Sequence, residues 1–232
     1  MAIRSFLAMT APEIAENPYV SANIAWMGCH FSPGGQELTD LPRQLPAGSL
    51  LTLNDRFPLH GHDPKRMAEQ LTQCIRSLHL WGLLLDLQRP GCEETHRLVR
   101  YLLEALPCPV AVSSLYAKEV NCPVFLPPAA PSVPLEEHFA PWNGREIWLE
   151  LALDAEAITL TDRGAVTTPL PSFPRSPAGH REQRLHCHYT IAQCPEGFRF
   201  SLWRTKGDLE DLLAEAARFP VSTAVGLWQE LG

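Results

Sequence analysis

The chain has 232 residues, 45% of them hydrophobic, and a formal net charge of -7. This composition is typical of a globular protein with a sizeable core, and no apolar stretch approaches the roughly 20 residues that span a bilayer. The 19 Lys and Arg residues form no dense run, so we expect neither a nucleic acid nor an anionic membrane as a partner. The 7 cysteines are odd in number and include no CxxC pair, which favours free thiols and a cytoplasmic location.

Eight short apolar runs of strand length follow one another along the chain, the first of them beginning at residue 20. They cover residues 20–28, 49–55, 82–88, 109–114, 123–126, 146–151, 185–191 and 222–228. Most are continuously apolar, as are strands that are covered on both faces of a parallel sheet. A hairpin is predicted at 153–168, because this segment alternates and contains a turn signal, Asp162-Arg163-Gly164. A further strand is predicted at 198–203.

Three helices carry clear signals. The first follows Asp63, a capping residue, with Pro64 at its first helical position. The second is predicted over 92–106, where apolar residues share one side and two glutamates suit the positive end of the helix dipole. The third opens with Thr205 and Asp208, which are spaced as in a capping box.

Strands and helices alternate over the middle of the chain, which predicts right-handed βαβ units. Eight candidate strands in a chain of 232 residues indicate one domain, 1–232, with an α/β fold: a compact and partly degenerate (β/α)8 TIM-like barrel. Pro-rich loops are expected at 127–134 and 164–184. An open doubly wound parallel sheet is the alternative. The sequence contains neither a G-x-G-x-x-G motif nor a P-loop, and we expect no cofactor.

Polar side chains occur where the predicted strands end, and parallel α/β folds form their ligand sites at these ends. Asp86 lies within an apolar run, so its carboxyl group needs a partner, such as Arg89, or a function. The candidate catalytic residues are Asp86, Glu150 and Asp55, although Asp55 could instead pair with Arg56. The candidate substrate-binding residues are Gln88, Arg89, Asn54, His30, Tyr116, Trp228 and Glu230. Tryptophan stacks on sugars, but Trp26, Trp148 and Trp228 are also candidate core residues.

Two His-x-His pairs are possible metal ligands, because alternate residues of an extended chain point to the same side. They are His60 with His62, and His186 with His188. The first pair lies in a loop just before a helix cap, and no further His or Asp set completes a site of three or four ligands. We therefore interpret these residues as ordinary histidines of a loop and of the core.

The strand at 82–88 carries Gly82, Asp86 and Gln88 in the pattern G-x-x-x-D-x-Q. It resembles a strand of the chitinase-like glycoside hydrolases, which has the form D-G-x-D-x-D-x-E in their (β/α)8 barrel. Leu84 stands where that family has an aspartate, and Gln88 stands where it has the glutamate. The segment GLWQELG at 226–232 is similar to the family's closing strand. The family's glutamate protonates the glycosidic oxygen, and a glutamine cannot act as that acid.

The leading hypothesis is a glycosidase-like barrel that binds a carbohydrate or another polyol at the carboxyl ends of its strands. Hydrolysis stays open, and it would need a second carboxyl group beside Asp86, from Asp55, Glu150 or Glu230. The alternatives are a metal-dependent hydrolase that uses a His-x-His pair and a catalytically silent binding or scaffolding protein. The sequence does not specify the substrate or the oligomeric state.

Overall fold

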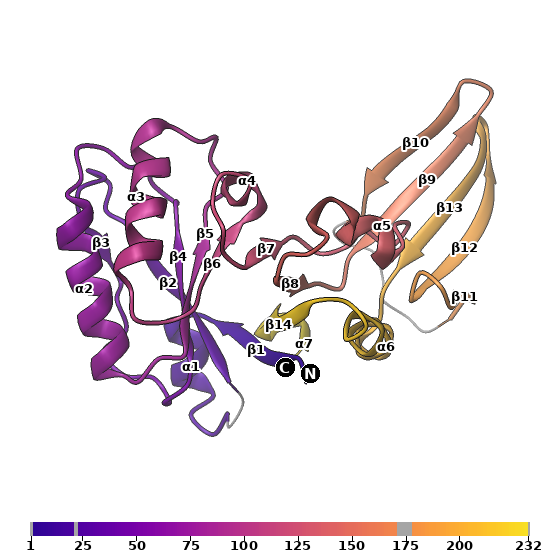
Figure 1. The fold of residues 1–232 in the computed structure, drawn as a ribbon. Helices are drawn as coiled ribbons and strands as arrows, with labels where there is room; N and C mark the ends of the chain where they lie inside the picture. Colours follow the sequence, from indigo (N-terminus) through magenta and orange to yellow (C-terminus); the bar gives the residue numbers. More distant parts are fainter. Residues whose placement is uncertain (1, 21–22, 171–177, 232) are drawn as a thin grey trace.

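The computed structural model describes residues 2–20, 23–170 and 178–231, and it contains a barrel with an antiparallel sheet beside it (Figure 1). The barrel strands are β1 (Arg4–Met9), β2 (Ile24–Phe31), β4 (Leu50–Asn54), β5 (Gly82–Asp86), β6 (Val110–Ser113), β7 (Val124–Leu126), β8 (Ile147–Leu151) and β14 (Val221–Leu227). All pair in parallel, and the pairing of β1 with β2 closes the ring. Closure confirms the predicted (β/α)8 barrel and excludes an open doubly wound sheet.

The interior of the barrel is filled by alternate residues of its strands. Trp148 of β8 is fully buried there and stacks on Trp81 with 5.0 Å between the ring centroids, which confirms it as a core residue. Gly82 at the start of β5 makes this packing possible. A Cβ atom at Gly82 would lie 2.9 Å from the carbonyl oxygen of Pro109 and 3.4 Å from the Trp148 ring, so a larger residue would overpack the barrel.

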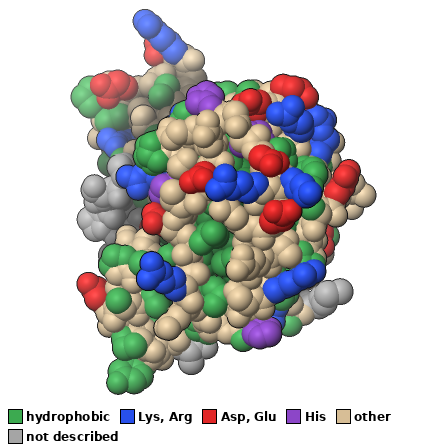
Figure 2. Space-filling model, turned by 90° about the vertical axis from the view of Figure 1, so that its left-hand side faces the viewer, with side chains coloured by type: hydrophobic (Ala, Val, Ile, Leu, Met, Phe, Trp, Pro, Cys, Tyr) green, Lys and Arg blue, Asp and Glu red, His purple; other side chains and the backbone are tan. Residues whose placement is uncertain are grey.

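The three predicted helices are confirmed as α2 (Pro64–Ser77), α3 (Glu93–Ala105) and α6 (Lys206–Ala216). Asp63 caps α2 by accepting a hydrogen bond from the backbone N–H of Lys65 at 3.0 Å, and a capping box opens α6. The other helices are short, as expected for a degenerate barrel: α1 (Ala11–Glu16), α4 (Ser114–Ala117), α5 (Leu135–Phe139), a 3-10 helix (Ala140–Trp142) and α7 (Trp228–Leu231). Figure 2 shows Lys and Arg interspersed with Asp and Glu on the side of the barrel that α2 and α3 cover.

An antiparallel sheet is inserted between β8 and α6. Its strands are β9 (Ala155–Thr161), β10 (Gly164–Pro169), β11 (His180–Glu182), β12 (Cys187–Cys194) and β13 (Gly197–Trp203), in the order β10-β9-β13-β12-β11. The predicted hairpin at 153–168 and the strand at 198–203 are confirmed as β9–β10 and β13. The predicted loop at 164–184 was wrong at its two ends, which form β10 and β11, and residues 171–177 of it lie outside the described residues.

The prediction that 185–191 is a barrel strand was wrong. Its residues lie mainly in β12, which pairs antiparallel with β11 and β13, and only the start of β12 is buried. The remaining place in the barrel is taken by β1, between β14 and β2. The first predicted strand, 20–28, was placed a few residues too early, because β2 runs over 24–31. The register of β2 with β4 shifts between Trp26 and Cys29.

A further two-residue strand, β3 (Leu38–Thr39), pairs antiparallel with the end of β2. Within the described part of the chain, no helix combines the length and the apolar character that a membrane crossing needs. All 7 cysteines are free thiols.

Candidate functional site

Asp86 is the last residue of β5 and points into the mouth of the barrel. Leu84, two residues earlier, belongs to the interior cluster, and alternate residues of a strand share a side. The amide Nε2 of Gln88 donates a hydrogen bond to Oδ1 of Asp86 at 2.5 Å. Burial raises the pKa of Asp86, the nearby charge of Asp55 raises it further, and the hydrogen bond from Gln88 opposes both.

The interpretation of Arg89 as the partner of Asp86 was wrong. Its Nε donates to the backbone carbonyl of Asp55 at 2.7 Å, and its Nη2 donates to the carbonyl of Arg56 at 2.9 Å. The guanidinium therefore joins the segment after β5 to the segment after β4. It leaves Asp86 with an uncharged partner, Gln88.

Asp55 holds the segment that carries Gln88. Its buried carboxylate accepts hydrogen bonds from the backbone N–H groups of Gln88 at 3.0 Å and Arg89 at 2.7 Å. Tyr116 fixes the same segment from α4, since its hydroxyl donates to the carbonyl of Arg89 at 2.8 Å. Ser113 of β6 does so too, by donating to the carbonyl of Leu87 at 2.6 Å. The ends of β4 and β6, the two neighbours of β5, thus set the position of Gln88 beside Asp86.

Glu150 is the second carboxyl group that points into the mouth. It follows Trp148 by two residues on β8, so the two side chains share the interior side. Burial raises the pKa of Glu150 to about 7, with contributions from the negative charges of Asp86, Asp154 and Glu230. Glu230 of α7 is held close to β8, because its Oε2 accepts a hydrogen bond from the backbone N–H of Leu153 at 2.7 Å.

The raised pKa of Glu150 predicts that the Glu150→Gln variant is more stable than the parent at alkaline pH. Because the folded-state pKa, about 7, lies above the ordinary glutamate value of 4.5, the folded state holds more protons between these values and loses stability as the pH rises through them. At about 1.4 kcal/mol per pKa unit the loss is at most about 3.5 kcal/mol, and about 1–2 kcal/mol after solvent screening. Urea unfolding at alkaline and at acidic pH measures it. Equal stability of the two proteins at alkaline pH would contradict the prediction.

Other predicted residues also lie at the strand ends. Asn54 is the register neighbour of Asp86 on β4, and its Oδ1 accepts a hydrogen bond from the backbone N–H of Arg56 at 3.1 Å. His30, near the end of β2, is held by Asp40 at 3.2 Å from its Nε2 and by Thr39 at 2.9 Å from its Nδ1. Trp228 is the half-buried first residue of α7.

The two His-x-His pairs do not form one site. His60 is exposed, and His62 is buried with neither ring nitrogen bonded. His186 contacts Glu215 at 2.6 Å and His188 contacts Asp208 at 2.8 Å, and both carboxylates belong to α6. The second pair therefore ties the inserted sheet to α6. The described residues contain no group of three His, Cys, Asp or Glu side chains that could hold a metal ion.

Arg204 is a buried residue near the mouth that the sequence reasoning missed. It follows β13 and is 1% exposed. Its guanidinium donates to the carbonyl oxygens of Ala129, Ala130, Leu185 and His186, and its backbone N–H donates to the carbonyl of Asp154 at 3.1 Å. The sequence contains one signal for Arg204: it is a single charged residue between the predicted strand at 198–203 and the capping residue Thr205. Arg204 thereby joins the loop after β7 to the base of the inserted sheet.

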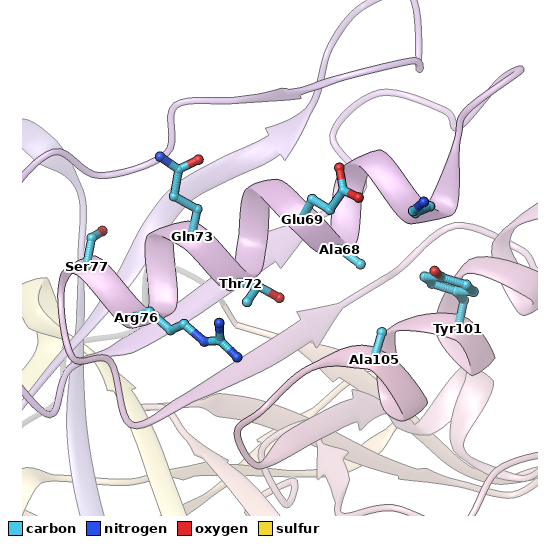
Figure 3. A pocket seen from close by; sticks show the side chains of 9 residues that line it. Ala68, Glu69, Thr72, Gln73, Arg76, Ser77, Tyr101 and Ala105 are labelled. Atoms are coloured by element: carbon cyan, nitrogen blue, oxygen red, sulfur yellow. The ribbon is translucent and has the colours of Figure 1, made fainter.

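A groove of about 690 Å³ lies away from these residues, between α2 and α3 (Figure 3). It is lined by both signs of charge, with Lys65, Glu69 and Arg76 on α2, and by Tyr101 on α3. None of the predicted site residues lines it. The groove belongs to the mixed outer surface of the barrel.

Comparison with solved structures gives several matches over nearly the whole chain. A chitinase-like agglutinin from Robinia pseudoacacia has a TM-score of 0.60 at 13% identity, over 100% of this chain and 96% of its own. A mutant GH18 chitinase from Cycas revoluta, in complex with (GlcNAc)4, has a TM-score of 0.58 at 14% identity, over 97% of this chain and 94% of its own. The spore cortex-lytic enzyme SleL from Bacillus cereus has a TM-score of 0.57 at 10% identity, over 100% of this chain and 72% of its own.

The chain has the fold of the chitinase-like barrels. No family model and no curated protein sequence matches it, so the likeness is one of structure. The matched fold confirms the architecture that the resemblance at 82–88 implied. Within this chitinase-like barrel, Asp86 ends the fourth parallel strand, Gln88 follows it by two residues, and Glu150 lies on the seventh strand.

Proposed function

We propose that this chitinase-like barrel binds a carbohydrate at the carboxyl ends of its parallel strands, with Asp86 and Gln88 as the central polar pair. The observation that carries the proposal is the hydrogen bond of 2.5 Å between these two side chains at the mouth. It is supported by the fold shared with a chitinase-like agglutinin and with a chitinase solved in complex with (GlcNAc)4.

The chemistry of the pair suits recognition of hydroxyl and amide groups. The Asp86 carboxylate accepts hydrogen bonds, and the Gln88 amide both donates and accepts. Asp55 and Tyr116 act as positioning residues, because they hydrogen-bond the backbone of Gln88 and Arg89. The Arg89 guanidinium supports them by joining this segment to the carbonyl groups of Asp55 and Arg56. A ligand therefore meets side chains that are already oriented, which lowers the entropy lost on binding.

The Asp86→Asn variant tests the proposal. Asparagine keeps the acceptor for Gln88 and removes the charge, so we expect a folded protein with weakened binding. With (GlcNAc)4 and a panel of other neutral oligosaccharides, the melting temperature of the parent should rise. A ligand at about 100 times its Kd adds about 2.7 kcal/mol, and most of this gain should be lost in the variant.

Asp162→Asn, in the exposed turn between β9 and β10, is the matched control and should keep the full shift. If no oligosaccharide of the panel raises the melting temperature of the parent protein, carbohydrate binding at this site is contradicted. An equal shift in the parent and in Asp86→Asn would remove Asp86 from the site.

Hydrolysis is a second candidate function, and one observation favours it. The acid position of the resembling family holds Gln88, but Glu150 has a pKa of about 7, so much of it keeps its proton near neutral pH. A carboxylic acid in this state can protonate a leaving oxygen, and Asp86 contributes the second carboxyl group that glycoside hydrolysis requires. Measuring the turnover of glycosides by Glu150 variants distinguishes hydrolysis from binding alone.

A further inference from the structure

The inserted sheet carries an unusual share of the exposed apolar surface. Eight large hydrophobic side chains of the described residues are exposed, and four of them lie on this sheet. These four are Leu160 at 43%, Val166 at 56%, Ile191 at 52% and Phe198 at 53% exposure. Contiguous exposed apolar patches on a protein surface mark interaction sites.

Register assigns these side chains to the two faces of the sheet. Phe198 lies directly opposite Leu160, and Phe200 lies opposite Ile158 on one side and Ile191 on the other. Directly opposed residues of an antiparallel pair share a face, as do alternate residues of one strand. One face therefore carries Ile158, Leu160, Tyr189, Ile191, Phe198 and Phe200, and we call it the apolar face. Val166 opposes Thr159 and lies on the other face.

The apolar face carries almost no charge. On β9, β10, β12 and β13 the same alternation places one ionisable carboxylate on it, Glu156, which is 7% exposed at the base of the sheet and bonds the backbone N–H of Ser132 at 2.7 Å. Arg199 points to the other face, because it lies between Phe198 and Phe200 on β13. The exposed part of the apolar face on these four strands thus combines aromatic and branched aliphatic side chains without Asp, Glu, Lys or Arg, and the register adds His180 and the half-buried Glu182 at its β11 edge.

We propose that the apolar face binds the same face of a second copy of this chain. Two copies that each carry a net charge of -7 repel each other over most of their surfaces, and the exposed part of this face on β9, β10, β12 and β13 brings no charges together. Sheets pack face to face about 10 Å apart through interdigitating apolar side chains. Such a face can contact its own copy about a twofold axis, as a closed dimer needs.

The size of the sheet sets the expected strength of the dimer. Four strands, β9, β10, β12 and β13, about 4.8 Å apart with about six residues each at ~3.3 Å, cover about 400 Å² per copy. The total of about 800 Å² lies in the size range of weak, transient interfaces, so the dimer is weak and forms with rising concentration. Figure 1 shows the far ends of β9, β10, β12 and β13 standing clear of the barrel, which leaves room for a second copy.

Light scattering of the full chain after size exclusion, over a wide concentration range, tests the proposal. The parent protein should pass from a mass of 25.8 kDa towards twice that value, and added salt should favour the dimer by screening the net charge. Phe198→Glu opposes two carboxylates across the interface and should keep the protein monomeric. Val166→Glu adds the same charge to the other face of the sheet and should dimerise like the parent.

Thermal melts of both variants check that each is folded, which is expected because both side chains are more than half exposed. A parent protein that stays monomeric at the highest concentration overturns the proposal. So does a folded Phe198→Glu that dimerises as strongly as the parent, or a Val166→Glu that loses the dimer equally. If the parent is monomeric and the apolar face instead binds an insoluble polysaccharide, with Phe198→Glu abolishing that binding, the face belongs to a glycan.

Discussion

Replacing Arg204 with methionine is expected to lower the free energy of unfolding by about 3–5 kcal/mol. Arg204 is 1% exposed, and its guanidinium donates to four backbone carbonyl oxygens from two separate segments, 129–130 and 185–186. Methionine fills much of the same volume and offers no donor. Buried carbonyl groups then lose their partners, and each unsatisfied group costs about 1–3 kcal/mol.

Urea unfolding measures this loss, with Arg199→Met as the matched control. Arg199 lies on β13, five residues before Arg204, but its side chain is exposed, so its replacement should change stability by less than about 0.5 kcal/mol. Because Arg204 joins the inserted sheet to the loop after β7, we also expect the sheet to open first in hydrogen exchange of Arg204→Met. A loss below about 1 kcal/mol would show that water or rearranged groups replace the guanidinium.

The second large effect concerns turnover, under the proposal that the mouth hydrolyses a glycosidic bond. Glu150→Gln should then lower kcat/KM by about 10²–10⁴-fold, the usual contribution of a positioned acid. Glutamine is nearly the same size and cannot donate a proton as an acid. The parent's kcat/KM should fall as the pH rises above about 7, because Glu150 loses its proton there.

Two further variants make this measurement decisive. Glu210→Gln, on the exposed side of α6, should leave turnover unchanged. Gln88→Glu places an acid where the resembling family has one. If Gln88→Glu gains turnover while Glu150→Gln matches the parent, the acid role belongs to position 88 and the assignment of Glu150 is contradicted. If the parent turns over none of the glycosides that it binds, binding alone remains as the function.

Local signals in the sequence were sufficient for the helices and for most strands. Asp63, Pro64, Thr205 and Asp208 act through the first turn of their own helices, so their effect is readable from neighbours in the chain. The turn at 162–164 is local in the same way. The alternation of apolar runs and helices also sufficed for the barrel, because parallel strands need crossovers.

The sequence was also sufficient to identify Asp86 as a candidate site residue, since an acid within an apolar run needs a hydrogen-bonding partner or a function. Its partner was decided by tertiary structure. Arg89 is three residues away, but its guanidinium bonds two carbonyl groups that follow β4, 34 and 33 residues back along the chain. Gln88 is turned towards Asp86 because Asp55, Tyr116 and Ser113 fix the backbone around it.

Long-range pairing decided the rest. β1 became a barrel strand through its two parallel neighbours, β14 and β2, whereas 185–191 joined the inserted sheet, although both are short runs with strand-like composition. The pKa of Glu150 is high because burial and three carboxylates from positions 86, 154 and 230 act on it together. Composition and spacing therefore determined which polar residues lie at the strand ends. Only the closed barrel decided which of them face one another, because closure brings together side chains from strands that are distant in sequence.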